Sequence, residues 1–320
     1  MINAYIKKCF TVLILCITAV MLSNEVRHML ETNQLFTLNI TSDRFKQLNI
    51  TCTTEEISTY AESIGADKGE LMIVCECMFD GDISSANISI NKSSFVRIRN
   101  YLKKKQPQLF NLEKNTYNGL LADIKYFPVP RSNKRKEWVN YVNSWNYERT
   151  YKGNRTHEGT DVMGDINKDG IYPVVSVSDG YISNIGWLEL GGWRIGITSP
   201  SGIYYYYAHL RKDTPYAEGL AVGQRVQAGE VIGFMGRTGY SAQENVNNIE
   251  TVHLHFGLQL IFDESQKECD SEIWIDVYPI IELLASHCSS VARDPQTGRW
   301  ERLYPYCDLD AEPLRSAAAR

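Results

Sequence analysis

Three short segments of the chain contain histidine and aspartate residues at spacings that suit a metal ion. His157 and Asp161 lie in the first segment, His209 in the second, and His253 and His255 in the third. A catalytic zinc ion usually has three protein ligands and keeps its fourth tetrahedral position for water. The sequence therefore predicts a catalytic zinc site that takes three of these five side chains as ligands and leaves two histidines for other roles.

The residues around this group favour extended backbone. Alternate residues of a strand face the same side, so His253 and His255 are expected to point together. An extended segment would also place His157 and Asp161 on one face, and Gly159 between them allows the backbone to pass close to an ion. The segment differs from the helical zinc motif His-Glu-x-x-His, because its fifth residue is an aspartate and a glycine disfavours a helix.

A single histidine would not support this prediction. On an apolar strand, a residue such as His209 is more often a core side chain bonded to the backbone than a catalyst. Because three segments with such residues occur together in this chain, we interpret His209 as part of a metal site and not as a core side chain. His28 and His287 have no comparable neighbours and receive no predicted function.

The order of the motifs, His-x-Gly-x-Asp, then Tyr-Ala-His-Leu, then His-Leu-His-Phe-Gly, resembles the lysostaphin-type zinc endopeptidases, which cut peptide bonds in bacterial peptidoglycan. The resemblance covers residues 126–284, about half of the chain. Residues 173–182 resemble the strand and turn that follow the family's first ligand pair, and residues 222–236 resemble its glycine-spaced strand pair. The resemblance implies a small antiparallel β core of the duplicated hybrid motif type, with a groove between its loops.

The same resemblance assigns roles to the five residues. It implies that His157, Asp161 and His255 are the zinc ligands, and that His209 and His253 are catalytic histidines that do not bind the metal. Zinc lowers the pKa of its bound water from about 15.7 toward 7, and a neighbouring imidazole can take the proton and pass it to the leaving amine. The second histidine can hold the water or stabilise the oxyanion. Which of His209 and His253 is the general base is left open.

Two neighbouring features have simpler interpretations. Tyr207 is two residues from His209 and would share its strand face, but residues 204–207 are more readily explained as aromatic cover for a small sheet. Residues 165–170 resemble the first half of an EF-hand calcium loop. Its twelfth position is Ser176 where a glutamate is needed, so we interpret the segment as a polar turn.

Length and composition set the frame for this prediction. A chain of 320 residues is long enough for about two domains, and a hydrophobic share of 43% is ordinary for a globular protein. The net charge of −5 gives no support to nucleic-acid binding.

The N-terminus predicts export. Lys7 and Lys8 precede an apolar run over residues 9–22, which suits a secretory signal and is short for a membrane span of about 20 residues. No small-x-small cleavage site follows, so residues 1–24 are either a signal peptide or a retained signal anchor that would tether the protein to the membrane. In both cases the catalytic part is expected to be extracytoplasmic, in the cell envelope.

The rest of the chain divides into three regions in an α+β fold. Residues 25–125 are predicted to be mostly helical, with a linker near residues 126–130, where two prolines favour extended backbone. Residues 126–290 are predicted to form the antiparallel β catalytic domain, and residues 291–320 a C-terminal tail without a recognisable pattern. The predicted strands are residues 172–177, 181–187, 193–198, 203–209, 230–235 and 253–260, and the predicted helices start near residues 54, 66, 94 and 278.

Cysteines and basic residues add little to the prediction. Two of the eight cysteines lie in the predicted export segment, and the others divide into three before the catalytic region and three within or after its end, so no disulfide framework can be derived. We expect Cys75 and Cys77 to lie on a buried helix. The basic amphipathic stretch over residues 94–106 could contact anionic wall polymers or lipid headgroups, but it is more often the solvated face of a packed helix.

The sequence therefore predicts an exported zinc metalloendopeptidase that hydrolyses peptide bonds in peptidoglycan cross-links or stem peptides. One alternative is a non-catalytic scaffold that keeps the peptidase fold and binds wall peptide or a partner protein, although such proteins typically lack one of the five site residues. A bacteriocin with the same site is a second alternative, for which a separate wall-binding module would be expected. The residues do not separate cleavage of glycine bridges from cleavage of direct cross-links.

Overall fold

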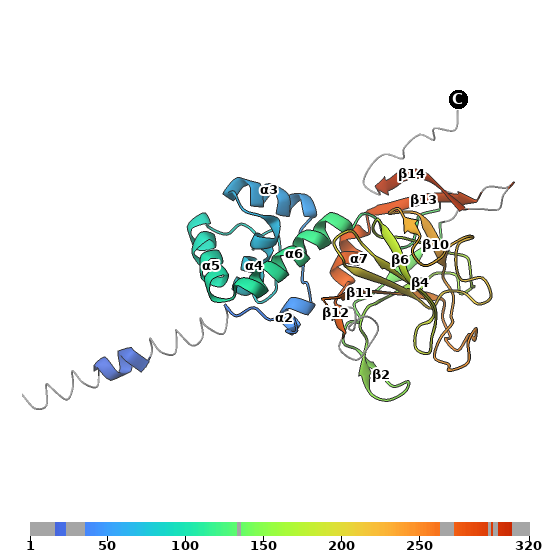
Figure 1. The fold of residues 1–320 in the computed structure, drawn as a ribbon, viewed down its shortest axis with the longest axis horizontal. Helices are drawn as coiled ribbons and strands as arrows, with labels where there is room; N and C mark the ends of the chain where they lie inside the picture. Colours follow the sequence, from blue (N-terminus) through green and yellow to red (C-terminus); the bar gives the residue numbers. More distant parts are fainter. Residues whose placement is uncertain are drawn as a thin grey trace, which may run out of the picture.

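The computed structural model describes residues 17–23, 36–132, 136–262, 272–293, 296 and 300–308. A group of helices on the N-terminal side is followed by a part built mainly of strands, and α6 connects the two (Figure 1). Residues 17–23 are helical, and the rest of the predicted export segment lies outside the described residues. Within the described ranges, no helix is long and apolar enough to cross a membrane.

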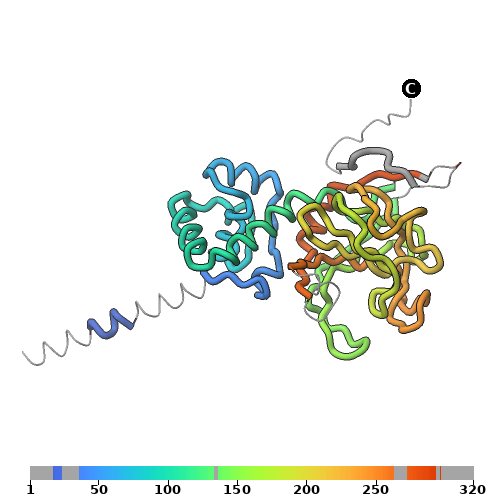
Figure 2. Tube along the Cα trace, in the orientation of Figure 1, coloured from blue at the N-terminus to red at the C-terminus, as the bar shows by residue number. Residues whose placement is uncertain are grey.

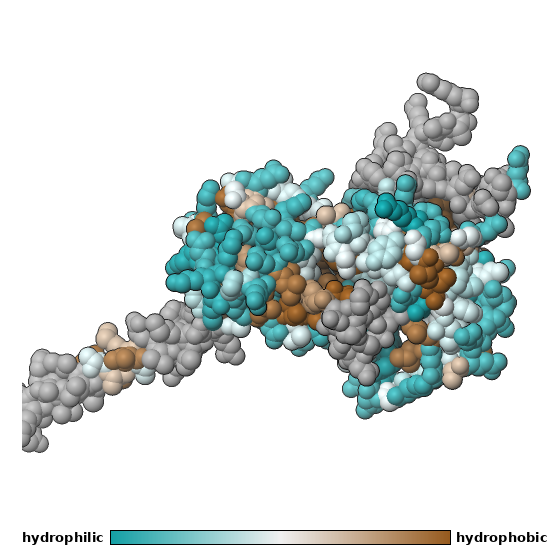
Figure 3. Space-filling model, in the orientation of Figure 1, coloured by the Kyte–Doolittle hydropathy of each residue, from teal (hydrophilic) through white to brown (hydrophobic). Residues whose placement is uncertain are grey.

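The helical part contains the helices that the sequence predicts and two more. Its helices are α2 (Asp43–Lys46), α3 (Thr54–Ile64), α4 (Lys68–Met78), α5 (Lys92–Lys105) and α6 (Pro107–Asp123). Thr53 and Glu56 form a reciprocal capping box at the start of α3, and Asp67 caps α4. The centre of α4 is buried on all sides, which explains its almost uniformly apolar sequence. Figure 3 shows hydrophilic residues over most of this part, with hydrophobic ones gathered toward the junction with the strands.

A polar cluster is enclosed between α2, α4 and α6. Glu76 is fully buried, and it accepts hydrogen bonds from the Arg44 guanidinium at 3.0 Å and the Tyr117 hydroxyl at 2.8 Å. Glu113 is also fully buried, and neither of its carboxylate oxygens has a hydrogen-bond partner. Burial, followed by the negative charge of Glu76, raises the pKa of Glu113 to about 9. Glu113 therefore holds its proton at neutral pH in the folded protein.

The Glu113→Gln substitution is expected to stabilise the protein in a pH-dependent way. The carboxyl has a pKa of about 9 when folded and 4.5 as its ordinary value, so between these limits only the unfolded state loses the proton and stability falls as pH rises. Glutamine has no proton to lose on unfolding, so its stability does not fall in this way. We expect the free energy of unfolding to rise by about 2–3 kcal/mol at pH 7 and to change little near pH 4.5. Urea unfolding at both pH values measures it. Glu62→Gln makes the same change at an exposed position and is the matched control. An equal gain from Glu113→Gln at both pH values would contradict the explanation.

The second part is an antiparallel β structure. Its main sheet has eight strands in the order β1-β4-β11-β8-β7-β6-β9, with β12 paired to β11. The main sheet consists of β1 (Val139–Tyr141), β4 (Thr160–Gly164), β6 (Gly180–Leu188), β7 (Gly192–Thr198), β8 (Tyr204–Ala208), β9 (Arg225–Val226), β11 (His253–Leu260) and β12 (Ile273–Ile275). Two-stranded sheets are formed by β2 (Glu148–Arg149) with β3 (Arg155–Thr156), β5 (Pro173–Val175) with β10 (Val231–Phe234), and β13 (His287–Arg293) with β14 (Trp300–Asp308). Helix α7 (Tyr278–Leu284) begins with a proline in its first turn. The predicted α+β fold, with a mainly antiparallel β part preceded by helices, is confirmed.

Two segments differ from the prediction in ways that tie the parts together. Residues 126–130 do not form a free linker: Phe127 and Val129 are fully buried, and Phe127 N–H donates to the His287 carbonyl. Residues 287–308 contain the paired strands β13 and β14 where the sequence shows no recognisable pattern. Figure 2 traces α6 from the helical part directly into the strand-rich part. Cys52, Cys75 and Cys77 are buried free thiols, so no disulfide joins these three cysteines.

Candidate metal centre

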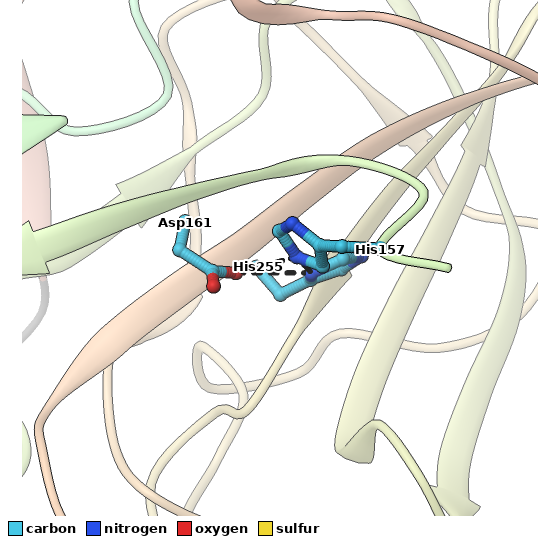
Figure 4. A group of neighbouring side chains, drawn as sticks. All are labelled: His157, Asp161 and His255. Atoms are coloured by element: carbon cyan, nitrogen blue, oxygen red, sulfur yellow. Dashed lines mark hydrogen bonds and ion pairs between the residues drawn. The ribbon is translucent and has the colours of Figure 1, made fainter. Parts of the chain in front are cut away.

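Two neighbouring strands bring together residues that are far apart in sequence. Strands β4 and β11 pair antiparallel, and Asp161 lies directly opposite His255 in their register. His157 precedes β4 and turns its ring toward the same point, so the three side chains converge (Figure 4). Gly159 makes this approach possible, because a Cβ atom there would lie 2.7 Å from the His255 ring.

The three converging side chains form a compact triangle of ligand atoms. His157 Nε2 lies 2.9 Å from His255 Nδ1 and 3.0 Å from Asp161 Oδ1, and His255 Nδ1 lies 3.1 Å from Asp161 Oδ1. Zinc–nitrogen bonds of about 2.0–2.1 Å at tetrahedral angles put ligand atoms about 3.3 Å apart. The donor set and its spacing therefore fit a zinc ion.

The hydrogen bond on the far side of the His157 ring fixes which nitrogen faces the triangle. His157 Nδ1 lies 3.1 Å from the Ser144 carbonyl and 3.0 Å from the Ser144 hydroxyl. A carbonyl can only accept, so we place the proton on Nδ1 and a lone pair on Nε2. Metal-bound histidines commonly donate their second N–H to a carbonyl in this way. A lone pair facing a carboxylate oxygen at 3.0 Å favours a cation between them.

The charge state of the triangle also suits a cation. Burial alone would raise the pKa of the Asp161 carboxyl, but the adjacent His157 and His255 rings outweigh it and hold that pKa well below its usual range. Burial lowers the pKa of His255. At neutral pH the site therefore combines a carboxylate with uncharged imidazole, which are the forms that bind a metal.

His209 and His253 lie beside the triangle as a second pair. Their ring centroids are 4.8 Å apart, and His253 Nε2 lies 3.8 Å from Asp161 Oδ1. Each ring directs Nδ1 at a backbone carbonyl 2.8 Å away, of Thr238 for His209 and of Thr251 for His253. This arrangement leaves Nε2 of both rings able to accept a proton. Burial keeps the pKa of His209 well below its ordinary value, so its ring is neutral before any reaction.

All five predicted residues line one groove with a volume of about 510 Å³. Tyr206 also lines it, and Tyr207 does not: Tyr207 is fully buried, and its hydroxyl accepts the Val177 N–H at 2.9 Å. His209 has a left-handed backbone with φ of 58°, which breaks the alternation along the strand and turns its ring away from the Tyr207 face. The expectation that Tyr207 shares a face with His209 is therefore wrong. The other lining residues include Arg155, Glu158, Leu188, Glu189, Leu190, Tyr240, Glu272 and Trp274.

Comparison with known proteins agrees with this site. The family model described as peptidase family M23 matches residues 155–268, which include all five residues. The crystal structure of a proposed glycyl-glycine endopeptidase lytM from Ruminococcus gnavus is 34% identical to this chain, with a TM-score of 0.59. That similarity covers 79% of this chain and 95% of the other. This chain belongs to peptidase family M23. The predicted resemblance to lysostaphin-type peptidases is confirmed.

Curated relatives of the M23 domain differ in the bonds named for them. The L-Ala–D-Glu endopeptidase of Bacillus subtilis (strain 168) is 37% identical over 132 residues, or 41% of this chain and 37% of the relative. The glycyl-glycine endopeptidase ALE-1 of Staphylococcus capitis is 34% identical over 131 residues, or 39% of this chain and 32% of the relative. This chain thus spans about a third of the length of these relatives.

The M23 site contains partners that the sequence analysis missed. Ser144 holds His157 from the loop between β1 and β2, and backbone carbonyls hold His209 and His253. Arg149, the last residue of β2 in the β2–β3 hairpin, donates to Asp161 Oδ2 at 2.7 Å while Oδ1 faces the two imidazoles. An arginine 12 residues from an aspartate has no spacing signal, so only the folded hairpin reveals the pair.

Arg149→Ala is expected to weaken zinc binding about 10- to 100-fold, the usual effect of losing a partner that orients a metal ligand. The guanidinium occupies the outer oxygen of Asp161, and its loss frees the carboxylate to rotate. Competition against a chelating dye measures the affinity. Lys152→Ala is the matched control, because Lys152 is on the same hairpin but pairs with Glu189. If both variants lost zinc affinity equally, the position of the whole hairpin, and not the contact between Arg149 and Asp161, would control zinc binding.

Proposed function

We propose that this M23 protein is a zinc metalloendopeptidase that hydrolyses peptide bonds in bacterial peptidoglycan. His157, Asp161 and His255 would hold the metal, and His209 and His253 would transfer protons. The observation that carries the proposal is the convergence of the three ligand atoms within 3.1 Å, beside two imidazoles that both direct Nε2 away from a carbonyl-bound Nδ1. The sequence identity of 37% and 34% to two endopeptidases supports peptide-bond hydrolysis as the reaction.

In this proposal, the metal and the two histidines that do not bind it have different roles in the reaction. Zinc, when bound, supplies an acidified water and a positive charge next to the scissile carbonyl. One of the two free Nε2 atoms accepts the proton of the attacking water and returns it to the leaving amine. The backbone carbonyl that accepts a hydrogen bond from Nδ1 of the same ring stabilises the imidazolium that exists between these two proton transfers. The other histidine is then placed to donate to the oxyanion that develops on the carbonyl oxygen.

The proposal extends to location and organisation. Peptidoglycan lies outside the cytoplasmic membrane, so we propose an extracytoplasmic protein of the cell envelope. We also propose that the catalytic domain begins near residue 126, because the backbone of residues 125–128 is hydrogen-bonded to Val175, Val177 and His287 of the β part. Membrane attachment through residues 1–24 stays a prediction.

The test is to incubate the purified full chain with peptidoglycan and to identify the released fragments by mass spectrometry. We expect new peptide termini that disappear with a chelator, return when zinc is added, and are absent with His253→Ala. The mass of the fragments would identify the bond. If the protein binds one equivalent of zinc and releases nothing, the scaffold alternative replaces the enzyme.

A further inference from the structure

A second cleft, with a volume of about 410 Å³, lies where the helical part meets the β part. Its walls come from residues 47–51 after α2, residues 143–146 between β1 and β2, and residues 276–282 at the start of α7. Figure 1 shows α2, β12 and α7 together at this junction. The Asp276 N–H donates to the Lys46 carbonyl at 2.7 Å, so a hydrogen bond joins the two parts beside the cleft. The volume falls within the range of small-molecule sites, which favour such interfaces.

The side chains of this cleft are mostly uncharged hydrogen-bonding groups. Its lining is Gln47, Asn49, Ile50, Thr51, Asn143, Trp145, Asn146, Asp276, Tyr278, Pro279 and Glu282. The exposed amides of Gln47, Asn49 and Asn146 make no side-chain hydrogen bond to another described residue, so they can offer both donors and acceptors to a ligand. Asp276 is only 4% exposed, and its Oδ1 accepts the Tyr278 N–H.

The composition of the lining restricts the ligand class. No lysine or arginine is among the lining residues and two are acidic, which disfavours phosphates, free carboxylates and other anions. The amides would be poorly satisfied by a lipid chain. Half-buried Trp145 and Tyr278 add aromatic surface with a polar edge. Amides, a carboxyl and aromatic rings together match a neutral molecule with many hydroxyl groups and apolar C–H faces.

We propose that this cleft binds a neutral saccharide of the N-acetylated amino-sugar class. An acetamido group presents one N–H and one C=O, which the cleft's carboxyl and amides can pair. The link to catalysis rests on the proposed function: the sugar would belong to the same polymer whose peptide enters the metal groove. The cleft would then hold the glycan while the groove holds the peptide.

One loop, residues 143–146, lines the cleft and also contacts the proposed zinc ligand His157. Ser144 binds the Nδ1 edge of His157, and the Asn146 N–H donates to the His157 carbonyl at 2.9 Å. Trp145 lies between these residues and packs in one cluster with Trp274 and Tyr206, both of which line the metal groove. A saccharide that contacts this loop therefore lies against residues that hold a proposed zinc ligand.

Titration calorimetry on the full chain tests the proposal with N,N′-diacetylchitobiose as the probe and cellobiose, which lacks acetamido groups, as its control. We expect chitobiose to bind, cellobiose not to bind, and Gln47→Ala/Asn49→Ala to weaken binding about tenfold or more through the loss of two hydrogen-bonding side chains. Gln227→Ala, an exposed amide outside the cleft, should bind as the unchanged protein does. Absent chitobiose binding, equal cellobiose binding, or full affinity in the double variant would each overturn the proposal.

A second measurement separates this inference from the peptidase proposal. The double variant should cut a glycan-free peptide at the unchanged rate and intact peptidoglycan more slowly. Equal rates on both substrates would overturn the link between the cleft and catalysis. The calorimetric readout needs no cleavage, so a protein that binds chitobiose and cuts nothing would refute the peptidase and leave the saccharide site supported.

Discussion

Asp161→Asn is expected to abolish zinc binding and peptide cleavage together. Asp161 Oδ1 lies within 3.1 Å of ligand nitrogens from both His157 and His255, so it belongs to the triangle itself. The amide that replaces it carries no charge and leaves two neutral imidazoles to hold a divalent cation. Loss of an outer partner costs about 10- to 100-fold in affinity, and loss of a ligand should cost more than 100-fold. Metal content by mass spectrometry and dye competition measure the effect.

A matched aspartate controls for the substitution. Asp213→Asn changes the same side chain in an exposed loop after β8, where Asp213 accepts from Asn245. We expect this variant to bind zinc and to cut as the unchanged protein does. If Asp161→Asn retains stoichiometric, tight zinc, the proposed ligand set is wrong.

His253→Ala and His209→Ala are each expected to lower kcat about 10²- to 10⁴-fold while zinc affinity changes little. Both rings direct Nδ1 at a backbone carbonyl, which leaves Nε2 able to transfer a proton. Neither Nε2 is within hydrogen-bonding distance of Asp161 Oδ1, the closer being 3.8 Å away. Removing one ring therefore removes an acid–base group and leaves the triangle intact. Cleavage rates at saturating zinc, alongside zinc titrations of the same preparations, give both quantities.

A histidine of the β part that lies outside the site, His287, provides the control. His287 lies on β13, is exposed, and lines neither cleft, so His287→Ala should leave both kcat and zinc affinity unchanged. Loss of zinc from His253→Ala would instead identify His253 as a ligand. Unchanged kcat in both His209→Ala and His253→Ala would remove the acid–base roles.

The site was predictable where chemistry follows residue type and strand periodicity. His253 and His255 line the same groove because they alternate on β11, and Gly159 lies where a larger residue would collide with His255. The prediction was wrong for Tyr207 because a left-handed residue, His209, interrupts the alternation. Ser144 and Arg149 act through contacts that only the tertiary fold creates, and no local pattern encodes them.

The fold was predictable to a similar extent. Helices with caps and apolar periodicity, such as α3, agree with their predicted positions. Helix α6 was missed because its sequence contains glycine, asparagine and threonine, which are weak helix formers. Burial of Phe110, Tyr117 and Leu120 stabilises it instead, and packing of this kind cannot be derived from propensity.

The pairing of β4 with β11 determines when the protein can acquire its metal. Asp161 and His255 are separated by 94 residues, so their ligand atoms meet only after the sheet has formed. A polypeptide threaded through a membrane before folding would carry no assembled site and would have to acquire its metal at its destination. Zinc captured there binds only the folded form and raises its stability as the free concentration exceeds the dissociation constant. Metal supply outside the cytoplasm would then limit both how much mature protein accumulates and how long it resists proteolysis.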